Sequence, residues 1–185
     1  MLAFETPKLR MRPMLPRDVP LFGSLYGDDQ TMQHIAPPVG REAAESLCLR
    51  ILRGAAQGRA PFLFAMEASG AAIGLCGVVQ LDPDRGEAEV GMMLLPHVCD
   101  QGYASEALPA LIDAAFMAFP IDRVWVQYHP AHQAAERLVM RVGLQPCRDG
   151  ELAERRPENR VWAVDRPYWT SRKINSNEGK DQCRA

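Results

Sequence analysis

The segment between residues 87 and 119 constrains the fold of this chain more than any other. An apolar run with strand character, residues 90–95, leads through CDQGYASEA (residues 99–107) into a long run with helical spacing. Gly102 lies at the junction, as expected where a backbone turns sharply or comes close to another group. The first N–H groups of a helix have no partner inside it, and they attract anions. The segment therefore predicts a strand, a tight loop and a helix whose N-terminus faces a phosphate group.

Three strands are expected before this loop, at residues 61–66, 73–81 and 87–95. They are short apolar runs separated by the turn-forming segments EASGAA and DPDRG. Consecutive strands joined by such short turns predict an antiparallel meander. The earlier part of the chain predicts a strand at residues 8–14 and helices at 16–28 and 40–58.

The chain after the loop alternates between helix and strand. A helix over residues 103–119 places apolar side chains on one face, although Pro109 inside it should cost about 3 kcal/mol or bend it. A strand at 123–129, a helix at 131–141 stopped by Gly143 and a last strand at 161–169 follow. This order predicts an α+β fold with a mixed, mostly antiparallel central sheet flanked by helices. Residues 1–170 are interpreted as a single domain and the polar stretch 171–185 as a mobile tail.

The composition narrows the classes of function. The 185 residues suit one domain, and the net charge of −2 gives no electrostatic basis for nucleic-acid binding. No apolar run reaches the roughly 18 residues that a membrane span needs, and the N-terminus lacks the apolar core of a signal peptide. The five cysteines contain no CxxC pair, so they predict reduced thiols and no zinc site. We therefore expect a cytoplasmic protein that binds neither nucleic acid nor membrane.

The order of elements, together with GEAEVGMMLLPHVCDQGYASEAL (residues 86–108), resembles the GNAT superfamily of acyl-CoA-dependent N-acyltransferases. The chain looks most like the RimJ/RimL branch, which acetylates ribosomal-protein N-termini and, in many relatives, small amines. The resemblance extends from FETPKLRMRP (residues 4–13) to RPYWTS (residues 166–171). It implies acetyl-CoA as the acyl donor and, as acceptor, an amine of a small molecule or a protein N-terminus. A homodimer is the common default for such a protein.

In that family, a loop of the form Gln/Arg-x-x-Gly-x-Gly/Ala holds the coenzyme A pyrophosphate with its backbone N–H groups. The chain departs from this pattern at Cys99, where the family has Gln or Arg, and at Asp100, where it commonly has a small residue. A carboxylate beside a diphosphate repels it by about 1 kcal/mol at roughly 4 Å in water, so Asp100 is expected to weaken the site. The resemblance implies coenzyme contacts from four residues of the loop and helix start: Gln101, Gly102, Tyr103 and Ala104.

The resemblance also implies coenzyme contacts outside the loop. The family often carries Asn-x-x-Ser at the start of the next helix, where this chain has His132 and Ala135. His132 is expected to act as a donor near the coenzyme. Leu94 and Leu95 are expected to flank the pantetheine arm, which pairs with a strand edge as a peptide does. A tyrosine that serves many relatives as general acid is replaced here by Val139.

Acyl transfer from a thioester to an amine needs a base, a donor to the oxyanion and a group that stabilises the leaving thiolate. Glu89 occupies the strand position where many relatives place the base, and Glu87 lies on the same face by strand alternation. Both are equally interpretable as solvated residues of a sheet face. The oxyanion donor is expected among the backbone N–H groups of residues 93–95, freed by a β-bulge. Tyr128 and Tyr103 are the candidate general acids.

Two alternatives to acetyl transfer stay open at this point. One is a GNAT-fold protein that has lost catalysis and binds an acyl-CoA or another metabolite. The other is a transferase that uses a longer acyl-CoA or an aminoacylated carrier, because the loop is the part that departs from the family. A metal site at His129 and His132 is not expected, because Pro130 breaks the helical register between them.

Overall fold

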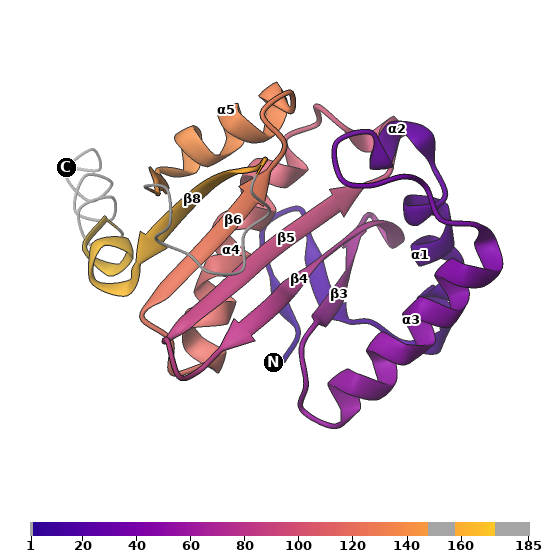
Figure 1. The fold of residues 1–185 in the computed structure, drawn as a ribbon, viewed down its shortest axis with the longest axis horizontal. Helices are drawn as coiled ribbons and strands as arrows, with labels where there is room; N and C mark the ends of the chain where they lie inside the picture. Colours follow the sequence, from indigo (N-terminus) through magenta and orange to yellow (C-terminus); the bar gives the residue numbers. More distant parts are fainter. Residues whose placement is uncertain (1, 148–157, 173–185) are drawn as a thin grey trace.

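A meander of three long strands, β3 (Phe62–Ala68), β4 (Ala71–Asp82) and β5 (Glu87–Leu94), forms the centre of the sheet (Figure 1). The computed structural model describes residues 2–147 and 158–172. The sheet has eight strands in the order β1-β2-β3-β4-β5-β6-β8-β7. The five further strands are β1 (Phe4–Glu5), β2 (Arg10–Pro13), β6 (Arg123–Tyr128), β7 (Gln145–Pro146) and β8 (Arg160–Asp165). The mixed, mostly antiparallel sheet expected from the sequence is confirmed.

Helices α1, α3, α4 and α5 lie where the sequence predicts them, whereas the short helix α2 was not expected. None of those in the described ranges is long and apolar enough to cross a lipid bilayer. Helix α4 continues through Pro109, so this proline does not end it. The bounds are η1 (Pro16–Asp18), α1 (Val19–Tyr26), α2 (Asp29–Met32), α3 (Arg41–Ala56), η2 (Pro96–Val98), α4 (Tyr103–Ala118) and α5 (Gln133–Val142), and residues 166–172 are also helical.

The sheet opens between β5 and β6. These two strands pair in parallel, joined by the crossover helix α4, but only from Glu87–Arg123 to Glu89–Trp125. Beyond that pair, β5 continues along β4 and β6 continues along β8, so the strands diverge toward their C-terminal ends (Figure 1). The divergence leaves one backbone edge of β5 facing a gap in the sheet.

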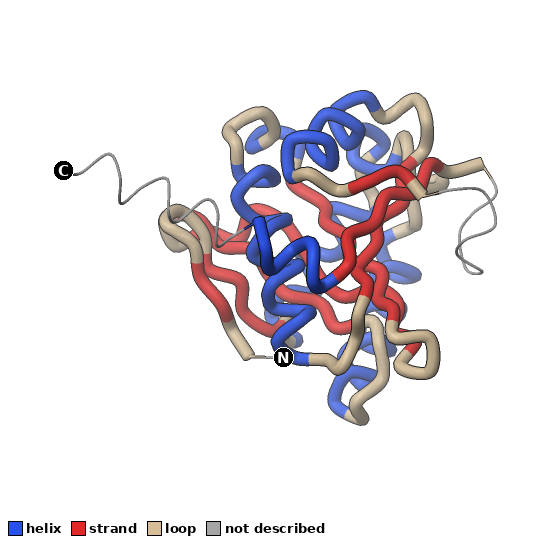
Figure 2. The backbone as a smooth tube through the Cα atoms, turned by 90° about the vertical axis from the view of Figure 1, so that its left-hand side faces the viewer, coloured by secondary structure: helices blue, strands red, loops and turns tan. Residues whose placement is uncertain are grey.

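Hydrophobic clusters cover the two faces of the sheet, and helices lie on both sides of the strands in the side view of Figure 2. On one face, α4 and α5 pack against alternate residues of the central strands, including Val90 and Val124. On the other face, α1 and α3 pack against residues such as Ala65 and Leu75. Because side chains alternate along β5, Glu89 belongs to the second face.

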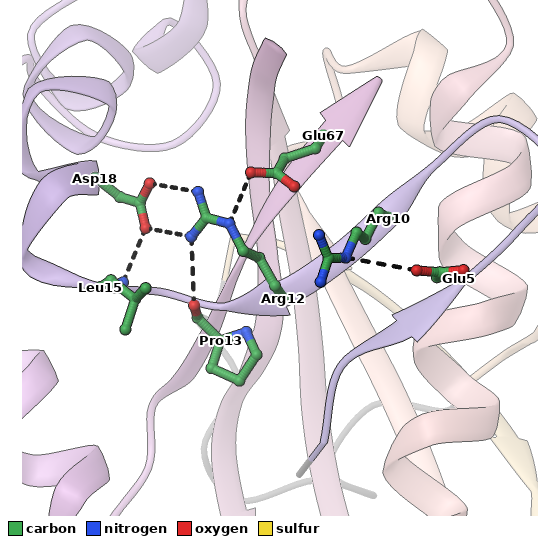
Figure 3. Close-up of polar contacts among 7 residues, drawn as sticks. All are labelled: Glu5, Arg10, Arg12, Pro13, Leu15, Asp18 and Glu67. Atoms are coloured by element: carbon green, nitrogen blue, oxygen red, sulfur yellow. Dashed lines mark hydrogen bonds and ion pairs between the residues drawn. The ribbon is translucent and has the colours of Figure 1, made fainter. Parts of the chain in front are cut away.

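A buried ion-pair network fixes the turn from β2 into η1 (Figure 3). The Arg12 guanidinium donates to both carboxylate oxygens of Asp18, at 2.7 and 2.9 Å, and to Glu67 at 2.7 Å. The Asp18 carboxylate also accepts the Leu15 N–H at 2.8 Å. Arg12 and Asp18 are 8% and 4% exposed, so the network lies inside the fold and its charges compensate one another.

The end of the chain differs from the sequence prediction. The strand expected over residues 161–169 ends at Asp165, and residues 166–172 turn into a helix. Arg166 explains the turn, because its guanidinium donates to the carbonyl oxygens of Phe116, Phe119 and Ile121, at 2.9, 3.0 and 2.9 Å, around the C-terminal end of α4. A guanidinium satisfies carbonyls that a helix end leaves without partners. The expected mobile tail lies outside the described residues from 173 onward.

Candidate active site

A cavity of about 510 Å³ lies where the C-terminal half of β5, the following loop, the start of α4 and the helix α5 meet. It contains five of the coenzyme residues expected from the sequence: Leu94, Gly102, Tyr103, Ala104 and His132. Leu95 and Gln101 do not line it. Leu95 is partly buried and packs against the hydrophobic core, and the Gln101 side chain donates to the His97 carbonyl at 3.1 Å.

Two residues of the loop before α4, Asp100 and Gly102, have a positive φ. Gly102 is the N-cap residue of α4 with a φ of +84°, and an added Cβ would meet nothing within 4 Å. Asp100 also has a positive φ, +62°, a conformation that Asp and Asn adopt more readily than most residues. The backbone therefore gives Asp100 a structural reason to stand where the family has a small residue. The first N–H groups of α4 lie at the cavity, since residues 102–105 line it.

Positive charge reaches the cavity from α5. Arg137 and Arg141 are four residues apart on one helix face, and both line the cavity. The Arg141 guanidinium donates to the Ser105 hydroxyl in the first turn of α4 at 3.3 Å. The loop lacks the cation of the family pattern, and these two arginines bring positive charge to the same cavity that Asp100 lines. Their four-residue spacing is visible in the sequence, but the sequence alone does not place that face against the loop.

His132 begins α5 as its N-cap, with Nδ1 accepting the Ala135 N–H at 3.4 Å. Burial first, and then the charges of His34 and Arg137, lower the pKa of His132. The neutral ring that accepts at Nδ1 carries its proton on Nε2, which can donate into the cavity. The His34 ring packs against it from the segment after α2, with the ring centroids 4.8 Å apart.

The free edge of β5 provides the backbone donors, although not by the expected bulge. The Leu95 N–H donates to the Ile73 carbonyl at 2.9 Å, and the register irregularity between β4 and β5 lies opposite Glu89 and Val90. The prediction of a bulge at residues 93–95 is therefore wrong. Because backbone groups alternate along a strand, the N–H groups of Met92 and Leu94 point away from β4 and into the gap beside β6.

The structure separates three of the four candidate catalytic residues: Glu89, Glu87 and Tyr128. Glu89 is 8% exposed, and its Oε1 accepts a hydrogen bond from Gln127 Nε2 at 3.1 Å. Glu87 lies at the start of β5 and pairs with Arg85 at 3.5 Å. Tyr128 is buried in the cluster under α4 and α5, on the opposite face of the sheet from Glu89. Burial, and then the charge of Glu136, raise the pKa of its phenol.

Glu87, Glu89 and Tyr128 do not line the cavity, whereas Tyr103, the other candidate general acid, does. Of the three that do not, Glu89 comes nearest along the chain, because Met92 and Met93, three and four residues further on in β5, are part of the lining. Within residues 2–147 and 158–172, no three histidine, cysteine or acidic side chains are placed to hold a metal ion.

A comparison with models of protein families shows which family the chain belongs to. The family model described as an acetyltransferase (GNAT) domain matches residues 8–145, from just before β2 to the first residue of β7. The chain is a GNAT acetyltransferase.

Similar proteins agree with this assignment of the GNAT domain. An uncharacterized N-acetyltransferase p20 of Bacillus licheniformis is 26% identical over 157 residues, which are 82% of this chain and 88% of the relative. A RimL ribosomal-protein alpha-N-acetyltransferase solved with coenzyme A superposes with a TM-score of 0.74 at 16% identity, covering 88% of this chain and 97% of that one. The microcin C7 self-immunity acetyltransferase MccE, solved with acetyl-CoA and AMP, gives 0.71 at 12% identity, covering 86% and 93%. The solved neighbours share the fold of this chain, and they include a RimL enzyme of the branch that the sequence resembles.

Proposed function

We propose that this GNAT acetyltransferase transfers the acetyl group of acetyl-CoA to a primary amine. One observation carries the proposal: a single cavity joins the start of α4 to the open edge of β5. GNAT acetyltransferases use acetyl-CoA, and the two solved relatives were obtained with coenzyme A or acetyl-CoA. The chemistry of this cavity fits such a donor from one end to the other.

The phosphate end of the donor would lie at the start of α4. The unpaired N–H groups after Gly102 and the partial positive charge of the helix N-terminus suit a diphosphate. Arg137 and Arg141 add two full positive charges from the opposite wall. The bare Cα of Gly102 leaves room for a close approach, because no atom lies within 4 Å of the place its Cβ would take.

The acyl end would lie along β5, where the Met92 and Leu94 N–H groups face the gap. An amide of the pantetheine arm or the thioester oxygen can accept from them. Glu89 takes the proton that the amine loses as its nitrogen attacks the thioester carbon. The C–N bond forms, the C–S bond breaks, and the coenzyme leaves as a thiol after gaining a proton from solvent. The buried Tyr128 has no part in this proposal.

The acceptor could be a protein N-terminus, as for the ribosomal-protein enzyme RimL, or a small-molecule amine. A thiol-release assay with acetyl-CoA and a panel of peptides and small primary amines identifies it. Once an acceptor is found, Glu89→Gln is expected to lower kcat by about 10²–10⁴-fold while leaving coenzyme A affinity intact. Glu87→Gln, on the same strand face, is the matched control.

The outcomes of this experiment are distinct. If Glu87→Gln loses turnover while Glu89→Gln keeps it, the base is Glu87. Coenzyme A binding without turnover on any amine refutes acetyl transfer and favours the binding-protein alternative. Turnover with a longer acyl-CoA but not with acetyl-CoA would refute acetyl-CoA as the donor and leave the assignment of the site unchanged.

A further inference from the structure

A chain of side-chain amides leads to Glu89 from outside the donor cavity. Gln127 Nε2 donates to Glu89 Oε1 at 3.1 Å, and Asn159 Nδ2 donates to Gln127 Oε1 at 3.1 Å. Each amide has a donor end and an acceptor end, so the two bonds give the chain one direction, from Asn159 through Gln127 to the carboxylate.

The opening of the sheet creates the place for this chain. The parallel ladder ends at the pair Glu89–Trp125, and Gln127 is the next residue of β6 on the same face as Trp125. Its side chain therefore starts beyond the last backbone contact between the strands and reaches back to Glu89. Gln127 bridges β5 and β6 at the base of the gap, where no backbone hydrogen bond does so.

Asn159 fixes which way the Gln127 amide faces. If that amide turned over, its oxygen would lie against the Glu89 carboxylate and its NH₂ group against the Asn159 donor, and both contacts would be repulsive. Asn159 precedes β8 and lines a second cavity of about 370 Å³, which shares His34 with the donor cavity. The orientation of Glu89 is thus tied to a residue that lines the second cavity.

A buried carboxylate needs such a partner. Glu89 is 8% exposed, and a charge at that depth is costly unless hydrogen bonds compensate it. The hydrogen bond from the Gln127 amide stabilises the ionised form of the carboxylate. It also occupies one carboxylate oxygen in a fixed direction, which sets the direction of the other.

We propose that Gln127, oriented by Asn159, is the positioning residue of the catalytic base Glu89. This inference rests on the proposed function, because it assumes that Glu89 removes the proton from the acceptor amine. Gln127 holds the carboxylate ionised and aimed across the gap, and it touches neither the donor nor the acceptor.

The test compares Gln127→Met and Asn159→Leu with the wild type. Methionine keeps the length of glutamine without its N–H donor. Gln80→Met is the matched control, since Gln80 is the cross-strand neighbour of Glu89 on β4 and no hydrogen bond joins the two in the described structure. All variants are assayed by thiol release with acetyl-CoA and the amine found for the wild type, across the pH range.

Gln127→Met is expected to lower kcat about tenfold at neutral pH, the value of one hydrogen bond to a charged group. Its KM for acetyl-CoA should stay unchanged, and the acidic limb of its kcat/KM profile should move to higher pH, because a carboxylate without its donor holds a proton more readily. Asn159→Leu should show the same changes to a smaller extent. Gln80→Met should leave the profile in place.

The inference is overturned if the acidic limb of the kcat/KM profile stays in place in Gln127→Met. It is also overturned if Gln80→Met shifts that limb equally, because the shift would then come from losing any polar side chain near Glu89 and not from losing this hydrogen bond. Turnover that depends on Glu89 but not on Gln127 refutes the inference alone. Full turnover in Glu89→Gln refutes the assigned base, and a wild type without turnover on any amine refutes the proposed function, so these failures are distinguishable.

Discussion

Replacing Asp18 with asparagine is expected to lower the free energy of unfolding by about 3 kcal/mol. The Asp18 carboxylate accepts two hydrogen bonds from Arg12, at 2.7 and 2.9 Å, and one from the Leu15 N–H at 2.8 Å. Asparagine keeps an oxygen for Leu15 but removes the charge, so a buried guanidinium loses one of its two carboxylates. Breaking a buried pair costs about 3–5 kcal/mol, and the retained Glu67 contact places this case at the lower end.

Urea unfolding followed by circular dichroism measures the loss. With a slope of about 2–3 kcal/mol per M, the midpoint should fall by about 1 M or somewhat more. Glu5→Gln is the matched control, because the neighbouring Glu5–Arg10 pair has side chains 71% and 59% exposed and should contribute nothing measurable (Figure 3). Equal midpoints for the two variants would refute the argument that burial makes the Asp18 pair stabilising.

The same network predicts a pH dependence. Burial alone raises the pKa of Asp18, but the hydrogen bonds from Arg12 and Leu15 outweigh it and hold the pKa below its usual value. The unfolded chain therefore binds this proton more readily than the folded one. The stabilisation is complete above the unfolded value of about 4 and is lost as the pH falls through the lower folded value. Asp18→Asn should unfold with a flatter dependence on pH in this acid range.

Three further changes are predicted. Asp100→Asn should tighten coenzyme A binding by roughly 0.5–1 kcal/mol in calorimetry at low salt, since it removes a repulsive charge and keeps a residue that tolerates positive φ; weaker binding would give Asp100 a positive role. Arg141→Ala should weaken coenzyme A binding by roughly 1 kcal/mol and reduce its salt dependence, and an unchanged titration would exclude this contact. Gly143→Ala should lower the free energy of unfolding in urea by about 1–2 kcal/mol, because φ is +84° and the added Cβ would overlap the Arg172 side chain.

The sequence predicts the fold where local signals agree with the tertiary structure. Strand runs bounded by turn residues give β3, β4 and β5, and the left-handed Gly143 ends α5 as expected. The final helix, residues 166–172, escapes prediction because its cause is remote in sequence. Arg166 turns the chain by binding carbonyls around the end of α4, about 50 positions earlier, and no local pattern shows such a contact.

The candidate site divides in the same way. Gly102 is identifiable from its place between a strand and a helix, and the structure gives it the positive φ that this place requires. The cations at the cavity are not identifiable, because Arg137 and Arg141 become part of it only when α5 packs beside α4. From the sequence, Asp100 is expected only to repel the diphosphate. The structure shows that its backbone has a positive φ, which aspartate tolerates better than most residues. The Gln127–Glu89 bond depends on where two strands separate, which a sequence pattern does not specify.

The central claim is that the N-terminus of α4 binds the diphosphate of coenzyme A. Isothermal titration of coenzyme A into the wild type, Gly102→Asp and Gly70→Asp tests it most directly. Gly102 and Gly70 both have a positive φ, +84° and +82°, and neither has an atom within 4 Å of an added Cβ. The two substitutions therefore bring similar strain and the same charge, but only Gly102 lines the cavity. The account predicts wild-type affinity in Gly70→Asp and at least about tenfold weaker binding, roughly 1.4 kcal/mol, in Gly102→Asp. Equal affinity in all three proteins would contradict it.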